Sequence, residues 1–155
     1  MKLKDSQLFE TLRTFSKAEF SEFCKFADSP YFKRGRNYLP FLKEIRKFHP
    51  DYSSESFSAE YIYGKLYPGR KFNIQVFKNL AGGLMRIAEE YLVQFGIKRQ
   101  RSEYLLQLSE ELQHRRITRA AGKLIKKTHK HLEESKYDTL YFGKMFRLLK
   151  SEAQY

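Results

Sequence analysis

Residues 72–96 read FNIQVFKNLAGGLMRIAEEYLVQFG and decide the fold of this chain. Apolar residues recur every three or four positions through the whole stretch, which is the spacing of one face of an α-helix. Val93, Phe95 and Ile97 also alternate as a strand would, but the unbroken helical period before them favours a helix that ends at Gly96. The face that this helix is expected to bury consists of Phe77, Leu80, Leu84, Ile87, Tyr91 and Phe95.

Helix signals recur on both sides of this stretch. Ser16 and Glu19 have the spacing of a capping box, in which each side chain satisfies a free backbone N–H at a helix start. Ser58 and Asn73 mark two further helix starts. Short links between the later helices predict antiparallel hairpins. Helices are expected near residues 8–15, 16–28, 37–48, 58–67, 73–96, 102–114, 116–132 and 138–152.

The predicted fold class is therefore all-α, a multi-helix array of about eight helices with no sheet of three or more strands. Residues 1–96 are expected to form a helical domain with a helix-turn-helix-like core. Residues 97–155 are expected to form a basic region of antiparallel helical hairpins, packed on the first domain. At 155 residues, the chain is long enough to bury an adequate core without a disulfide or a metal.

The composition points to a polyanionic partner. The chain has 30 Lys and Arg residues and 18 acidic residues, which gives a formal net charge of +12. Such a surplus favours nucleic acid, an acidic protein face or an anionic membrane surface. The single cysteine, Cys24, excludes an internal disulfide and fits a reducing compartment. With no signal-peptide pattern and no apolar run of about 18–20 residues, the sequence predicts no transmembrane segment and a cytoplasmic location.

No motif in the sequence supplies a catalytic constellation. Residues 64–71 (GKLYPGRK) approach the phosphate-binding loop but lack its Ser or Thr, displace the lysine and follow no strand. His129 and His131 point about 200° apart on a helix, so they cannot grip one metal ion together. The sequence predicts no enzymatic activity, no cofactor and no metal site.

One feature stands above this background, a row of basic residues on the seventh expected helix. Its members fall at steps of three or four, on the face opposite the apolar stripe, and predict a basic surface about 20 Å long. Regularly spaced cations of this kind can neutralise successive phosphates. The basic loop at residues 33–36 and the bases at 98–101 extend the candidate site. The candidate residues are Arg115, Arg116, Arg119, Lys123, Lys126, Lys127, Lys130, Lys98, Arg99, Arg101, Lys33, Arg34 and Arg36.

Residues 38–95 also resemble the helical core of bacterial winged-helix DNA-binding domains of the response-regulator and antibiotic-regulatory-protein type. The resemblance rests on LPFLKEI (39–45), FHP (48–50), SAEYI (58–62) and LYPG (66–69). It implies a positioning helix, a recognition helix and contact with DNA. Residues 102–152 are similar to the tetratricopeptide-type hairpins that follow such domains in some of these proteins. Residues 96–101 leave no room for the β-hairpin wing of the family.

The sequence therefore predicts a non-catalytic protein that binds, or is associated with, DNA or RNA. The alternative is a helical protein-protein interaction adaptor that binds an acidic partner. Phe142, Met145 and Leu149 are expected to face inward on the last helix, and another chain or the first helices are expected to cover them. The sequence leaves these two kinds of binding open.

Overall fold

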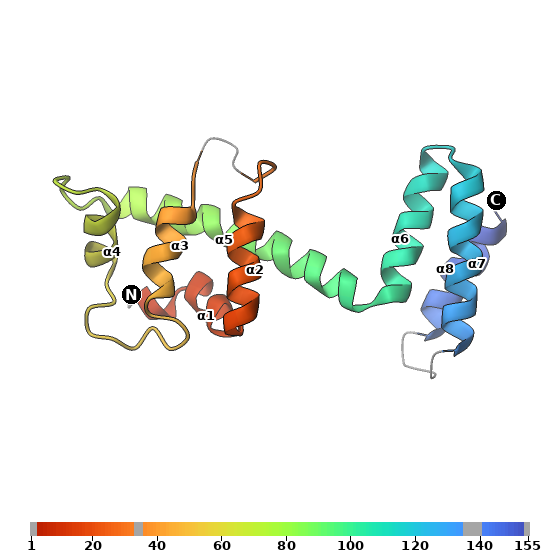
Figure 1. Cartoon of the computed structure of the whole chain (residues 1–155), viewed down its shortest axis with the longest axis horizontal. Helices are drawn as coiled ribbons and strands as arrows, with labels where there is room; N and C mark the ends of the chain where they lie inside the picture. The colour runs from red at the N-terminus through yellow and green to blue at the C-terminus, as the bar shows by residue number, and fades with distance from the viewer. Residues whose placement is uncertain (1–2, 33–35, 135–140, 154–155) are drawn as a thin grey trace. The chain divides into compact units, whose positions relative to one another are not determined.

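The computed structural model describes residues 3–32, 36–134 and 141–153, and every regular element in these ranges is a helix. The all-α fold class and the number of eight α-helices are confirmed (Figure 1). Val93, Phe95 and Ile97 are helical. In chain order the elements are a 3₁₀ turn (Leu3–Asp5), α1 (Gln7–Arg13), α2 (Lys17–Ala27), α3 (Leu39–Arg46), α4 (Ala59–Leu66), α5 (Ile74–Arg99), α6 (Arg101–His114), α7 (Thr118–Glu134) and α8 (Tyr141–Ala153).

The chain divides into two compact units, Met1–Leu92 and Val93–Tyr155. In the first unit, α1 to α4 gather along α5 (Figure 1). Its core is built from aromatic rings at edge-on and tilted angles. Phe9 packs on Phe57 with ring centroids 4.9 Å apart, and Tyr91 lies 5.5 Å from both Phe15 and Phe23. Such pairs add to the hydrophobic stabilisation that burial of the rings provides.

Three helix starts have the caps that the sequence predicts. Ser16 accepts from the backbone N–H of Glu19 at 3.1 Å, and the Glu19 carboxylate accepts from the backbone N–H of Ser16 at 2.8 Å. Ser58 caps α4 by accepting from Tyr61 N–H at 3.1 Å. Asn73 accepts from the second and third N–H groups of α5 at 2.9 and 3.1 Å. These side chains satisfy backbone donors that would otherwise lack partners.

Two expected helix ends are wrong. The long helix does not stop at Gly96 but continues to Arg99, and Gln100 N–H still donates to Gly96 C=O at 3.3 Å. A single exposed glycine costs a helix only about 1 kcal/mol, which is too little to end it. The third helix is shorter than expected and spans Leu39–Arg46 instead of 37–48.

Cys24 is half-buried, whereas its place on the apolar stripe of α2 predicts full burial. Burial nevertheless raises the pKa of the Cys24 thiol, and the nearby Arg46 lowers it less. The thiol is therefore protonated at neutral pH, which makes it a weak nucleophile.

The second unit consists of the end of α5, from Val93, and of α6, α7 and α8, which lie side by side (Figure 1). Its core contains Leu106 of α6, Ile125 and Leu132 of α7, and Leu148 of α8. Polar contacts also fix α8 against α6. Ser151 donates to the Gln113 side chain at 2.9 Å, and the Gln113 amide donates back to Ser151 C=O at 2.9 Å.

Arg147 of α8 completes this attachment. Its guanidinium donates to both oxygens of Glu110 at 3.0 Å and also pairs with Glu103, both on α6. Hydrogen bonding to Glu110, and then to Glu103, raises the pKa of Arg147 above its ordinary value. A bidentate pair of this kind fixes direction as well as distance.

The two central glycines of α5 have different surroundings and make a matched pair. A Cβ at Gly82 would meet nothing within 4 Å, whereas a Cβ at Gly83 would clash with the ring and hydroxyl of Tyr38. Gly83→Ala is therefore expected to lower the free energy of unfolding, because Tyr38 must move. Gly82→Ala should raise it by about 1 kcal/mol through helix propensity alone. Urea unfolding of the two variants checks this, and equal effects would contradict the close approach of Tyr38.

Candidate nucleic-acid interface

The candidate interface lies on α7, whose buried face holds it in place. Ala121, Ile125, Thr128 and Leu132 are all buried, at 0 to 3% exposure. The Thr128 hydroxyl donates to Leu124 C=O at 2.8 Å, so this buried polar group is satisfied within the helix. Burial of this apolar stripe fixes the rotation of α7 about its own axis and thereby decides which side chains face solvent.

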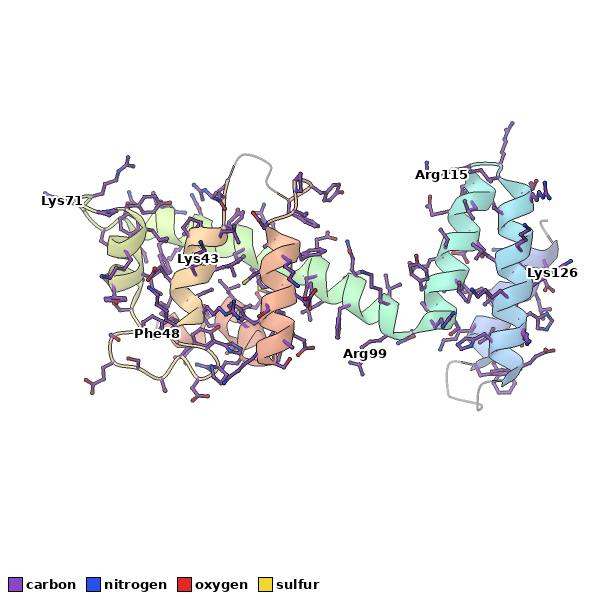
Figure 2. The ribbon with its side chains drawn as sticks, viewed as in Figure 1. Lys43, Phe48, Lys71, Arg99, Arg115 and Lys126 are labelled. Atoms are coloured by element: carbon purple, nitrogen blue, oxygen red, sulfur yellow. The ribbon has the colours of Figure 1, made fainter. Side chains whose placement is uncertain are left out.

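The opposite face of α7 is basic along most of its length. At about 100° per residue, the five bases of the helix fall within an arc of roughly 100° that is centred opposite the buried stripe. Figure 2 shows Lys126 projecting from the side of α7 that is turned away from α6. We call this set the α7 basic row. Its members, all exposed, are Arg119, Lys123, Lys126, Lys127 and Lys130.

The length of the α7 basic row suits a run of phosphates. Arg119 and Lys130 are separated by eleven residues, or about 16 Å along the axis at a rise of 1.5 Å per residue. Double-stranded DNA carries one negative charge per about 1.7 Å of its axis. Several phosphates of one duplex therefore fall within reach of the row.

Four of the five charges of the row have no ion-pair partner in the part of the chain that the structure describes. Among the described residues, no carboxylate forms an ion pair with Arg119, Lys123, Lys126 or Lys127. The acidic group of α7 that lies near the row is found at its C-terminal end and contacts a histidine. Glu133, near the end of α7, lies 3.5 Å from His129. A phosphate that meets these four side chains thus does not have to displace a pre-existing ion pair.

Arg115 and Arg116 do not lie on the helix that carries the row, which corrects the expectation for Arg116. Helix α7 begins only at Thr118, and both arginines belong to the turn that ends α6. Arg116 has a positive φ of 60° and donates its N–H to Gln113 C=O at 2.8 Å. This is the left-handed residue that closes many helices and is usually glycine. Both side chains are exposed, and Arg115 pairs with Glu111 at 3.5 Å.

The remaining candidate bases lie outside α7. Lys98 and Arg99 end α5 and Arg101 begins α6, so Arg99 and Arg115 lie at opposite ends of α6 (Figure 2). Fourteen residues of helix, about 21 Å, separate the two groups. The 20 Å surface therefore does not include residues 98–101 as a neighbour of Arg115. Arg36 is exposed in the first unit, and Lys33 and Arg34 lie outside the described residues.

The GKLYPGRK segment forms the end of α4 and the turn after it, with Gly69 at a φ of 76°. In the part of the chain that the structure describes, no three His, Cys, Asp or Glu side chains lie close enough to hold a metal ion. No described helix combines the length and the apolarity needed to cross a membrane.

Sequence reasoning missed the polar contacts that position α8. The partners of Arg147 lie 37 and 44 residues away in the chain, and those of Ser151 lie 38 residues away. Ion pairs between helices leave no periodic signal in a sequence, unlike pairs three or four residues apart. Only the packing of α8 against α6 brings these groups together.

No family model, no curated protein and no solved structure matches this chain. The geometry and charge of the α7 basic row are therefore the observations that bear on function.

Two adjacent residues of α7, one buried and one exposed, test the assignment of its two faces. Ile125→Ala is expected to lower the free energy of unfolding by about 2–5 kcal/mol, because Ile125 is 3% exposed and its loss leaves a cavity. Lys126→Ala should change it by less than about 0.5 kcal/mol, because Lys126 is exposed. Thermal unfolding followed by circular dichroism measures both. A large loss for Lys126→Ala would show that the assigned faces of α7 are wrong.

Proposed function

We propose that this chain is a non-catalytic nucleic-acid-binding protein that holds phosphates through the α7 basic row. The observation that carries the proposal is the arrangement of its cations. Exposed bases occupy one arc of a helix whose opposite face is core, and four of them have no described carboxylate partner. Chance surface lysines are usually interspersed with acids at helical spacing, which this row lacks until Glu133.

The energetic gain comes from the release of counterions. Each phosphate neutralised by a lysine or arginine frees condensed cations from the nucleic acid, so binding weakens steeply as salt increases. Contact with four phosphates gives an affinity that falls as roughly the 3.6 power of the salt concentration on duplex DNA. The second unit as a whole supports this attraction, with 14 basic and 7 acidic residues between 93 and 155.

The composition of the row favours backbone contacts over base recognition. It contains four lysines and Arg119, and no Asn, Gln or aromatic residue. Lysine meets phosphate as a point charge, whereas reading of base edges typically uses Arg, Asn or Gln in bidentate contact. We therefore expect binding with little sequence preference. An acidic protein is the alternative polyanion, and the binding test below separates the two.

Charge reversal of the row tests the proposal. A variant with Arg119, Lys123, Lys126 and Lys127 all changed to Glu is expected to lose at least 100-fold in affinity for a mixed-sequence duplex at low salt. The reason is that four attractive contacts become repulsive. Fluorescence anisotropy with labelled duplex DNA, duplex RNA and polyglutamate measures the change. Wild-type protein should bind both duplexes and ignore polyglutamate.

A matched control removes the effect of net charge. Lys17, Lys43, Lys71 and Lys78 are equally exposed but lie in the first unit. Their joint change to Glu alters the net charge by the same amount and should reduce affinity far less than the change in the row. Equal losses in the two variants would show that binding depends on total charge alone. Binding of polyglutamate but not of duplexes would favour the adaptor alternative.

A further inference from the structure

Helix α8 presents an apolar strip to solvent. Phe142, Phe146 and Leu149 are 74, 70 and 52% exposed. Their spacing of four and then three residues puts them on one face of the helix and equals the spacing of the seam positions in a coiled coil. We call these three residues the α8 strip.

The α8 strip is distinct from the face by which α8 joins its own unit. Leu148 is fully buried, and Tyr141 and Met145 pack against the same core. The expectation that Phe142, Met145 and Leu149 face inward together is therefore wrong, since only Met145 does. Phe146 also belongs to the exposed face.

The surface beside the strip leaves room for a neighbouring helix. Gly143 is exposed, and a Cβ built on it would meet nothing within 4 Å. Small residues at such a place let a second backbone approach closely. Two exposed phenylalanines on one helical face are also unusual for a protein surface, where large apolar patches commonly mark interaction sites.

The charge of the second unit indicates which kind of partner fits the α8 strip. The second unit carries a net charge of +7. Lys150, exposed, flanks the α8 strip on one side, and Glu152, on the other side, is engaged by His129, whose Nδ1 lies 3.3 Å from the carboxylate. Two copies of this unit placed face to face would repel each other. Helix α8 also has only 13 residues, fewer than two heptads, whereas coiled coils are recognised over three or more. A helix with acidic flanks avoids both problems, because it meets opposite charge and packs as a fourth helix on the unit.

We infer that the α8 strip is a docking face for an amphipathic helix of another protein, with an apolar seam and acidic flanks. The leucine or similar side chains of that helix would pack on Phe142, Phe146 and Leu149, and its carboxylates would lie near Lys150. This contact uses a different face from the α7 basic row and does not depend on nucleic-acid binding.

Two synthetic peptides of about three heptads test the inference on the whole chain. Both carry Leu at the seam positions, one with Glu and the other with Lys at the flanking positions. Isothermal titration calorimetry should show that the Glu peptide binds at least 10-fold more tightly than the Lys peptide. The joint change Phe146→Ser and Leu149→Ser should abolish at least 90% of that affinity. Ile74→Ser with Val93→Ser, which removes two apolar residues 50 and 57% exposed elsewhere, should leave it unchanged.

Circular dichroism confirms that both double variants keep their helix content. The inference is overturned if neither peptide binds, if both bind equally, or if the strip variant binds as well as wild type. Sedimentation velocity tests whether a second copy of this chain binds the α8 strip. A wild-type dimer that Phe146→Ser converts to a monomer would make a second copy the occupant and would also overturn the inference.

Discussion

The structure of the second unit depends on the burial of one stripe of α7. Ala121, Ile125 and Leu132 enter the core with Leu106 and Leu148, and this contact fixes how α7 is rotated. Because a helix turns about 100° per residue, fixing one face also fixes the opposite one. The exposed row of lysines with Arg119 is thus a consequence of core packing. The packing of the core fixes the direction in which α7 presents this row. Core packing alone is enough to place these cations on one face of the helix.

The two units obtain their stability in different ways. The first unit buries aromatic rings around α5, with Phe9, Tyr52 and Phe57 packed on one another at 4.9 to 5.1 Å. The second uses a small aliphatic core together with polar ties from Arg147 and Ser151. Such contacts join helices without enlarging the apolar area of a unit whose outer surface is charged. Repulsion among the charges of the α7 basic row destabilises the unit, and the nucleic acid proposed to bind there would relieve it.

Local periodicity made most of the fold predictable, and non-local contacts account for the rest. The apolar spacing of 72–96 and the caps at Ser16, Ser58 and Asn73 are properties of short segments, so the helices they predict are present. Arg116 was misplaced because glycine usually occupies the left-handed position that it takes. On α8, Tyr141, Met145 and Leu148 form one apolar stripe, and Phe142, Phe146 and Leu149 form another. Sequence alone does not show which stripe faces the core. The resemblance to winged-helix domains stays a prediction.

We propose that nucleic acid lies along the outer face of α7, and NMR chemical-shift mapping can locate it there residue by residue. Backbone amides and lysine side chains of the uniformly labelled chain are followed while an unlabelled mixed-sequence duplex is added at low salt. We expect shift changes that cluster between Arg119 and Lys130, recur at helical spacing and vanish as salt is raised. Changes centred on residues of the first unit, or no change at any salt concentration, would contradict it.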